Sequence, residues 1–454
     1  MKKNFYYFIF GILLIMLSLT ITKAQEKPSQ TNPENEFLQK IDLTQFPTPI
    51  YQQYIGNGVT LDWLIDQALV NNRNLLAVRQ NRDILAAKRL QAGLRPNPQI
   101  SVQFGSDQLA SRTGEYDLDA TFSQPFERGG KRQKRVQVVE LELAQAEKEI
   151  AFQEQTLRSE IYSQYINTLA TAKTLELVEK LVALTQENLR LVNVKFEQGD
   201  AAKLDLQLTQ VELNRWKSVL LQTDLQVKAN LLQLKTLAGL EANAALKLTE
   251  FFPAQITSQL NLLDLQTQAL ANRLDLQAAR VKEELSQAQI DLATANAKPD
   301  INLFATYSEE REVEDMILAR SSNVNRKIGV GITIPLAINN RNQGTIAQFA
   351  ATKTQIRYQR EQLEQQIKQE VALALNRLEG SKDTLKLFES DILPKAQDNL
   401  KIISVAYQLG EQELLAVIAE QRRLIDFQQQ FIQINKEYYL SLVALEKAIG
   451  GKIN

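Results

Sequence analysis

The feature that most limits the fold of this chain is a run of about 68 residues, from Lys131 to Gln198, that contains neither glycine nor proline. Apolar residues recur along it at steps of three, four and seven, the pattern of a coiled-coil seam: Val136, Val139, Leu143, Ala146, Ile150 and Leu157. At 1.5 Å per residue, such a helix is roughly 100 Å long, which exceeds the diameter of a small domain. The run therefore predicts an elongated helical protein.

The sequence also contains two copies of one module of about 200 residues. The segment 97–100 (Asn-Pro-Gln-Ile) returns as 298–301 (Lys-Pro-Asp-Ile), and 196–199 (Phe-Glu-Gln-Gly) returns as 407–410 (Tyr-Gln-Leu-Gly). Repetition on this scale indicates one structural unit used twice. We divide the chain into an N-terminal extension, a first repeat, a connector and a second repeat, at 25–60, 61–240, 241–261 and 262–454.

Each module is expected to pair one long helix with two shorter ones that lie end to end beside it. The long helices are expected near 129–196 and 341–408, with shorter pieces near 67–94 and 201–240 beside the first of them. Proline has no N–H to donate and clashes with the preceding turn of a helix. Pro394 is therefore expected to kink the second long helix.

Composition excludes most kinds of active site. The chain has no Cys and no His, and its 52 Lys and Arg nearly balance its 53 Asp and Glu. These absences exclude thiol chemistry, disulfides, zinc centres of the usual ligand types and imidazole catalysis. The even charge argues against nucleic-acid binding. We expect no metal centre and no cofactor. An enzyme with paired carboxylates stays open as an alternative, although no pair of Asp or Glu stands out.

The first residues have the form of a secretory signal peptide. Lys2 and Lys3 precede an apolar stretch at 5–21, and Ala24 supplies a small residue at the expected cleavage site. An uncleaved membrane anchor is the alternative. We assign 1–24 to the signal, which predicts a bacterial periplasmic or outer-membrane destination.

Four segments show the period-two alternation of β-strands. They lie near 98–107, 117–126, 299–308 and 327–337, and a strand of about 9–11 residues spans an outer membrane when it is tilted. A soluble half-buried hairpin shows the same alternation and remains the alternative. Four strands are too few to close a barrel, and an open edge in lipid leaves backbone groups unpaired. We expect several copies to share one barrel, with about twelve strands from three copies.

Prolines mark the strand ends that face the helices. These corner residues are Pro98, Pro125, Pro299 and Pro335. Because proline has no N–H for the ladder, it readily starts or ends a strand. The segments at the opposite ends, 106–116 and 308–326, are largely polar and are expected to be outward-facing loops.

Three features of the chain resemble the TolC-like outer-membrane efflux proteins, or outer membrane factors. They are the duplicated module, the junction 124–132 (Gln-Pro-Phe-Glu-Arg-Gly-Gly-Lys-Arg) and the turns that end in Gly199 and Gly410. The resemblance covers about residues 61–450. The Gly-Gly-Lys-Arg motif is most similar to the CzcC-like heavy-metal efflux branch. The family implies a mainly α fold with a β-barrel portion: a homotrimer whose barrel of about twelve strands continues into a periplasmic α-helical barrel.

The resemblance implies a passive duct without chemistry of its own. Its role would be the outer-membrane channel of a tripartite efflux pump or secretion system, exporting heavy-metal cations or drugs. The implied partners are outer-membrane lipid, a periplasmic adaptor (membrane-fusion) protein and an inner-membrane pump of the resistance-nodulation-division type. A soluble periplasmic coiled-coil scaffold or adaptor is the alternative from another class.

The family places its functional contacts at the helix tips. Adaptor docking is implied at Gly199, Asp200, Leu204, Gly410, Glu411 and Leu414. A pore constriction is implied at Phe196, Asp205, Tyr407, Glu411 and Glu413. Some relatives close the pore with an Arg and two Asp at the second tip, but this chain has Gln412, Ala416 and Ala419 there. An acidic ring of Glu411 and Glu413 would replace that latch, and two solvated glutamates are the alternative. Helix capping alone also explains both glycines.

Overall fold

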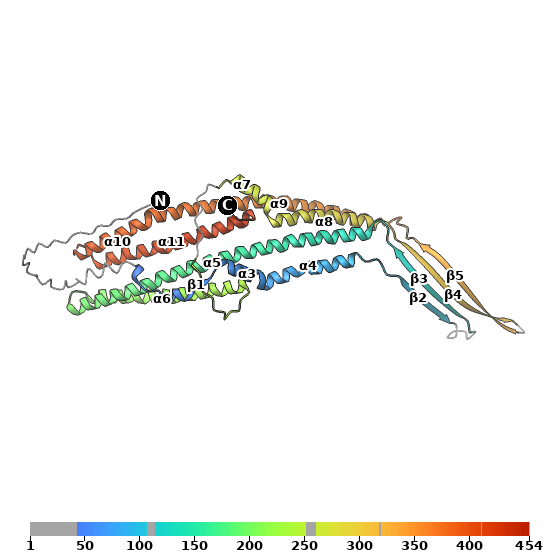
Figure 1. Cartoon of the computed structure of the whole chain (residues 1–454), viewed down its shortest axis with the longest axis horizontal. Coiled ribbons are helices and arrows are strands. Elements are labelled where there is room, and N and C mark those ends of the chain that lie inside the picture. Colours follow the sequence, from blue (N-terminus) through green and yellow to red (C-terminus); the bar gives the residue numbers. More distant parts are fainter. Residues whose placement is uncertain (1–42, 107–113, 251–259, 317–318, 410, 454) are drawn as a thin grey trace, which may run out of the picture.

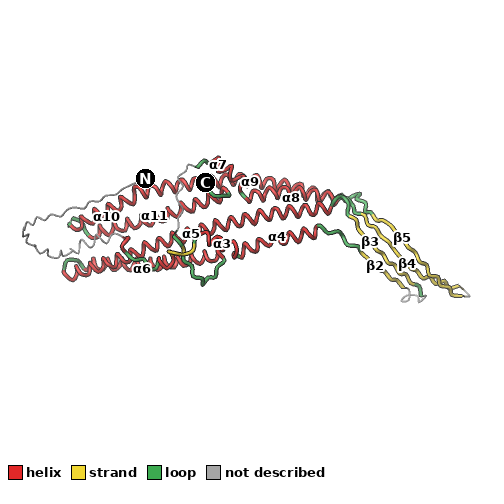
Figure 2. The backbone as a smooth tube through the Cα atoms, viewed as in Figure 1, coloured by secondary structure: helices red, strands yellow, loops and turns green. Residues whose placement is uncertain are grey.

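The computed structural model describes residues 43–106, 114–250, 260–316, 319–409 and 411–453. The molecule is long and narrow, with the helices bundled along most of its length and the strands extending from one end (Figure 1). Figure 2 shows loop segments that join the ends of the helices to the strands. The expected signal at 1–24 and the extension up to residue 42 lie outside the described residues.

The long helix of the first repeat is α5, which runs from Lys131 to Gln198 without a break. Helix α4 (Arg73–Ala92) packs beside its first part and α6 (Lys203–Ala238) beside its last part. The expected single piece at 67–94 is divided, because α3 (Leu61–Asn71) ends before α4 begins. Asn72 makes this break: its backbone is extended and its side chain accepts a hydrogen bond from the Leu75 N–H, which caps α4.

The second repeat copies this arrangement. Its helices are α7 (Leu262–Asn272), α8 (Leu274–Asn296), α9 (Gln343–Leu387), α10 (Leu393–Gln408) and α11 (Leu414–Ile449). Helix α8 packs on α9, and α11 packs on both α9 and α10. Helices α8 and α11 also pack on α5, so the two repeats lie side by side with α5 at their junction. No helix in the described ranges combines the length and the apolar content of a transmembrane helix.

The expected interruption at Pro394 takes a specific form. Between α9 and α10 the chain makes one π-helical turn, η3 (Phe388–Ile392), in which the Leu393 N–H bonds to the Phe388 carbonyl. A π turn contains one more residue than an α turn. The wider turn directly precedes Pro394, whose missing N–H and bulky ring disrupt regular α geometry.

The four strands form one antiparallel sheet in the order β2-β3-β4-β5. The strands are β2 (Gln99–Ser106), β3 (Tyr116–Phe126), β4 (Ile301–Met316) and β5 (Ala319–Thr333). The expected loop at 308–326 is wrong, because β4 and β5 extend through most of it. Its residues are mostly polar on both faces, which hid the strand pattern. Cross-strand ion pairs such as Glu309–Arg326, 2.9 Å apart, join the two strands there.

The corner prolines lie at or near the expected strand ends. Pro98 directly precedes β2, and Pro299 lies two residues before β4. Pro125 is the penultimate residue of β3. Pro335 lies beyond its strand, because β5 ends at Thr333 rather than near 337. The Lys131 ammonium, 2.8 Å from the Asp300 carboxylate, joins the two repeats at this level.

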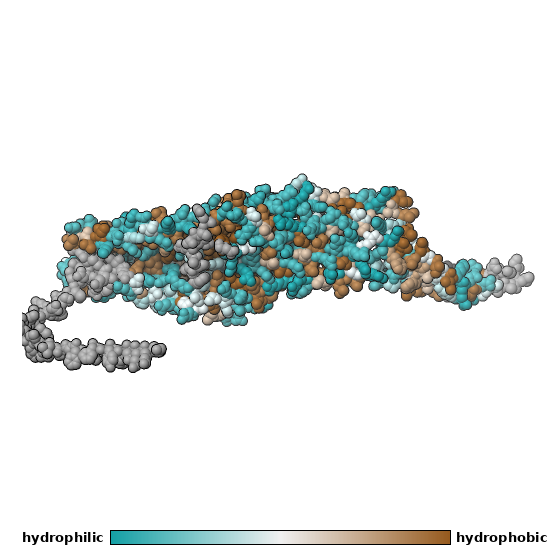
Figure 3. Space-filling view, turned by 45° about the horizontal axis from the view of Figure 1, so that its top comes forward, coloured by the Kyte–Doolittle hydropathy of each residue, from teal (hydrophilic) through white to brown (hydrophobic). Residues whose placement is uncertain are grey.

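One face of the sheet is apolar and the other is polar. Register places these residues on one face: Ile100, Val102, Phe104, Leu118, Ala120, Phe122, Leu303, Ala305, Tyr307, Ile328, Val330 and Ile332. Figure 3 shows hydrophobic side chains gathered next to the helices and hydrophilic ones farther out. The inward Phe304, which weakened the expected alternation, packs over Gly331, where a Cβ would lie only 2.5 Å from its ring.

The residues before the first repeat pack on α5 near its middle. They form η1 (Leu43–Gln45), α2 (Tyr51–Tyr54) and β1 (Ile55–Val59). The Glu179 carboxylate accepts hydrogen bonds from the backbone N–H groups of Ile50 and Tyr51, at 2.9 and 2.8 Å. These two bonds fix the start of α2 on the long helix.

A half-buried carboxylate on α5, that of Glu176, lies one turn away from this contact. Burial opposes ionisation of Glu176, but hydrogen bonds from Lys180 and Lys173 hold its pKa below the ordinary value. Lys173 also pairs with Glu250, 2.6 Å away, and lies over the Tyr51 ring. This ion cluster ties the chain on both sides of the first repeat to α5.

Candidate functional site at the helix tips

The first tip is the turn between α5 and α6. Gly199 has a left-handed backbone with φ of 87°, and the Asp200 N–H bonds back to the Lys195 carbonyl at 2.8 Å. This is the Schellman type of helix end, which glycine favours. Asp205, implied as a constriction residue, has a local contact here: its carboxylate accepts a hydrogen bond from the Ala202 N–H at the start of α6.

The second tip, between α10 and α11, closes in a similar way. The Glu411 N–H bonds to the Ala406 carbonyl at 2.9 Å. Glu411 and Glu413 are both exposed, and Leu414 begins α11. Gly410 lies outside the described residues. The other implied docking residues lie at or next to the two turns where the long hairpins reverse.

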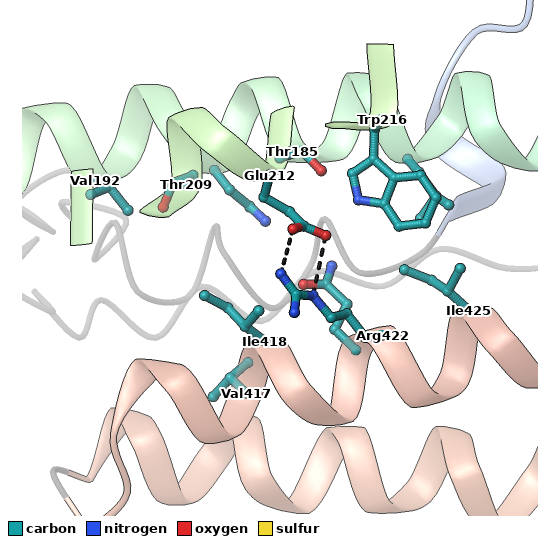
Figure 4. Close-up of a pocket in the computed structure, with 12 residues that line it drawn as sticks. Thr185, Val192, Thr209, Glu212, Trp216, Val417, Ile418, Arg422 and Ile425 are labelled. Atoms are coloured by element: carbon teal, nitrogen blue, oxygen red, sulfur yellow. Dashed lines mark hydrogen bonds and ion pairs between the residues drawn. The ribbon is translucent and has the colours of Figure 1, made fainter. Parts of the chain in front are cut away.

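A cation–π contact and an ion pair join the first tip region to the second. The Lys195 ammonium lies 5.8 Å from the centre of the Tyr407 ring, a cation–π distance. Farther from the turns, Arg422 on α11 makes a bidentate ion pair with Glu212 on α6, with one N–O distance of 3.2 Å (Figure 4). Of the residues implied for the constriction, Tyr407 is therefore brought against the other hairpin.

The Glu212–Arg422 pair borders a small internal cavity of about 40 Å³. Trp216 and Ile425 pack together in its wall (Figure 4), which also includes Thr185 and Asn188 of α5. The Asn188 Oδ1 is buried and accepts no hydrogen bond from any described residue. The two hairpins therefore meet across an ion pair, an apolar contact and a small cavity whose lining is mostly apolar.

The sequence reasoning missed this ion pair. Glu212 aligns with Arg423 rather than Arg422 when the repeats are matched at an offset of 211, because 423 − 212 = 211. Its side chain is 12 % exposed while that of Arg422 is 50 % exposed. The one available signal was opposite charge at nearly equivalent positions, which does not identify spatial partners.

We expect the Glu212–Arg422 pair to restrict separation of the two hairpins. Arg422→Gln leaves the carboxylate with Arg215, whose guanidinium nitrogen is 3.4 Å away. Because Arg422 is half exposed, the substitution should reduce the free energy that holds the two hairpins together by about 0.5–1 kcal/mol. Hydrogen exchange of the α11 amides near residue 422 should accelerate about two- to fivefold, as that free energy implies. The swap Glu212→Arg with Arg422→Glu should restore slow exchange, and equal exchange in all three proteins would contradict the coupling.

The comparison with protein-family models matches both repeats. The model described as "Outer membrane efflux protein" matches residues 64–240 and 265–451. The cobalt-zinc-cadmium resistance protein CzcC of Cupriavidus metallidurans is 20% identical over 411 residues, covering 88% of this chain and 92% of that protein. The outer membrane protein TolC of Vibrio cholerae is 22% identical over 396 residues, covering 85% of this chain and 90% of that protein.

Solved structures share the fold. A CusC structure superposes with a TM-score of 0.70 at 20% identity, covering 86% of this chain and 92% of that one. The outer membrane protein VceC of Vibrio cholerae gives a TM-score of 0.66 at 20% identity, covering 87% and 97%. The expected mainly helical fold with a strand portion is confirmed. Both repeats are covered by the family model, and the chain therefore belongs to the outer membrane efflux protein family and is an outer-membrane efflux channel.

Proposed function

We propose that three copies of this chain form one closed tunnel, that its tips dock on a periplasmic adaptor served by an inner-membrane pump, and that it passes divalent metal cations. One observation carries the proposal. The sheet has unpaired edges at β2 and β5, and one of its faces is apolar across all four strands. In lipid, such edges must be paired.

Closure by further copies satisfies both edges at once. If β5 of one copy pairs with β2 of the next, each edge is used and the apolar faces form one continuous outer band. Four strands per copy give about twelve strands for three copies, which is within the size range of outer-membrane barrels. The helices that adjoin the strands would then close into a ring with the copies in the same order.

The tips carry the adaptor contact in this proposal. Leu204 is 62% exposed just after the first turn, and Asp200 and Glu411 are exposed at the two turns. An exposed leucine beside exposed acids supports contact with an apolar and polar partner surface. The pump selects and drives the substrate, and this chain provides the exit.

The polar face of the sheet favours cations. It carries Asp117, Asp119, Glu310 and Glu312 against the single base Lys327, whose ammonium is 3.6 Å from Glu310. Aligned acids that line a passage raise the local concentration of positive ions. The similarity to CzcC, named a cobalt-zinc-cadmium resistance protein, agrees with a metal cargo.

Deletion of the gene tests the cargo. The deletion strain should stop growing at lower Zn²⁺, Cd²⁺ or Co²⁺ concentrations, and the intact gene should restore resistance. Increased sensitivity to organic drugs with unchanged metal resistance would instead assign a drug cargo.

Ion selectivity tests the acidic face directly. In planar bilayers the purified channel should prefer cations, and Asp117→Asn with Asp119→Asn should reduce that preference, because the pair contributes two negative charges per copy to the passage. Glu309→Gln is the control, since Glu309 lies on the opposite face of the sheet. Equal reversal potentials for all three proteins would show that these carboxylates do not line the passage.

A further inference from the structure

Helices α9 and α10 carry an exposed row of residues on the face turned away from α11. In α9 the row advances by seven residues, through Leu373, Gly380 and Leu387. In α10 it continues through Lys395, Ile402 and Leu409, again by seven. The step from Leu387 to Lys395 is eight, and it spans the π turn η3. Leu387, Ile402 and Leu409 are 50%, 67% and 70% exposed.

The buried row of the same helices shows the same extra residue. It passes through Ile367, Ala374, Ser381 and Phe388 in steps of seven, and Ser381 contacts Ser441 of α11. Beyond the turn, the row continues at Ala396, which is 3% exposed and packs against α11 residues. Phe388 to Ala396 is again a step of eight.

Without the π turn, a regular α-helix of the same sequence would not keep either row on its face. A step of seven from Phe388 would place Lys395 in the buried row, and a step of seven from Leu387 would place Pro394 in the exposed one. One inserted residue rotates all later side chains by about 100° in a regular α-helix. A π turn absorbs one residue, so the rows beyond it return to their faces.

We infer that the π turn before Pro394 is a phase-correcting element: it absorbs one extra residue, so that the side chains of α10 stay on the same two faces as those of α9. One of these faces packs on α11, and the other docks on α6 of a second copy of this chain. The inference rests on the proposed closure by further copies. It adds the contact surface and the element that aligns it.

Helix α6 offers the complementary surface. Its exposed apolar residues follow the same seven-residue step with neighbours one turn away: Leu204, Leu208, Val211, Leu221, Leu225 and Leu232. Helices α6 and α10 lie on opposite sides of the bundle (Figure 1). Leu208 lies five residues from the start of α6 and Ile402 six residues from the end of α10, which places both about 8–9 Å along their helices from the turns. The two rows therefore face each other when copies stand side by side.

Pro394 accounts for the position of the turn. Proline supplies no N–H to the preceding turn and its ring clashes with the carbonyl four residues earlier. A widened turn relieves that clash, so the proline and the extra residue occur together. Replacing proline alone leaves the extra residue in place.

The first test is a cross-link between copies. The chain has no cysteine, so Leu208→Cys with Ile402→Cys introduces the one reactive pair. Oxidation in outer-membrane fractions should give disulfide-linked multimers on a denaturing gel without reductant. Multimers on a native gel without cross-links would overturn the contact and leave the closure intact. Monomers on both gels would overturn the proposed closure itself.

The second test separates the rotation of the side chains around the helix axis from the length of the helix. Deletion of Ser390 with Pro394→Ala removes the extra residue and permits a regular helix, so the rows stay aligned. Deletion of Asp398 shortens the same helix by one residue beyond the turn and rotates Ile402 and Leu409 off the row. Both deleted residues are exposed, and neither side chain makes a hydrogen bond or ion pair with described residues.

The cross-link of the cysteine pair is the readout for both deletions. The first variant should retain most of the cross-linked product, and the second should lose it. Equal cross-linking of the two variants, or loss in the first with retention in the second, would overturn the phase-correcting role. Loss in both would also overturn it, because the first variant preserves the alignment that the inference requires.

Discussion

Val330→Lys is expected to abolish assembly of the channel in the outer membrane. Val330 is 84% exposed on the apolar face of β5, opposite Ala305 in the register. A lysine on the lipid face of a barrel strand costs about 2–4 kcal/mol at the bilayer midplane. Every copy in a closed barrel bears this cost, so the total rises with the number of copies. Assembly is measured by heat-modifiable migration of outer-membrane fractions.

The matched control lies one residue away. Gly329 points to the polar face, and no atom lies within 4 Å of a Cβ built on it. Gly329→Lys therefore adds the same charge to the same strand without meeting lipid, and it should assemble normally. If Val330→Lys assembles as well as Gly329→Lys, the apolar face does not contact the bilayer.

Gly199→Val is expected to impair export while the protein still inserts in the outer membrane. Gly199 has φ of 87°, and no atom lies within 4 Å of an added Cβ, so the effect comes from the backbone alone. The left-handed conformation costs an ordinary residue about 1–2 kcal/mol, and a β-branched residue more. The turn that presents the first tip should therefore change shape. Substrate resistance at equal amounts of outer-membrane protein measures the effect.

A second substitution at the same position is the control. Asparagine tolerates the left-handed region, so Gly199→Asn should retain most of the export. Unchanged resistance with valine would show that the shape of this turn does not matter for function. Reduced membrane insertion with valine would place the defect in folding rather than in docking.

The elements with strong periodicity were predictable. Helix α5 follows from a run free of glycine and proline, and the two faces of the sheet follow from the alternation of residues such as Val330 and Gly329. In the sequence, the only sign of the π turn was Pro394. The extra residue is found by counting heptads across this proline, and that count requires the helix boundaries to be known first.

The remaining features depend on contacts that no local pattern records. The outer half of the β4–β5 hairpin is polar on both faces, so no alternation marks it. The Glu212–Arg422 pair joins residues 210 apart in the sequence. Asn72 divides α3 from α4 by one side-chain cap inside an otherwise helical pattern.

The two hairpins of this molecule differ in the continuity of their long helices. Helix α5 is one continuous rod from the sheet to the first tip, whereas its counterpart has a joint at the π turn, part of the way to the second tip. Force applied at the tips therefore bends the second arm at that joint before it bends the first. Movement at the mouth of the proposed tunnel should accordingly come from α10 and α11, while α5 and α6 serve as the fixed frame.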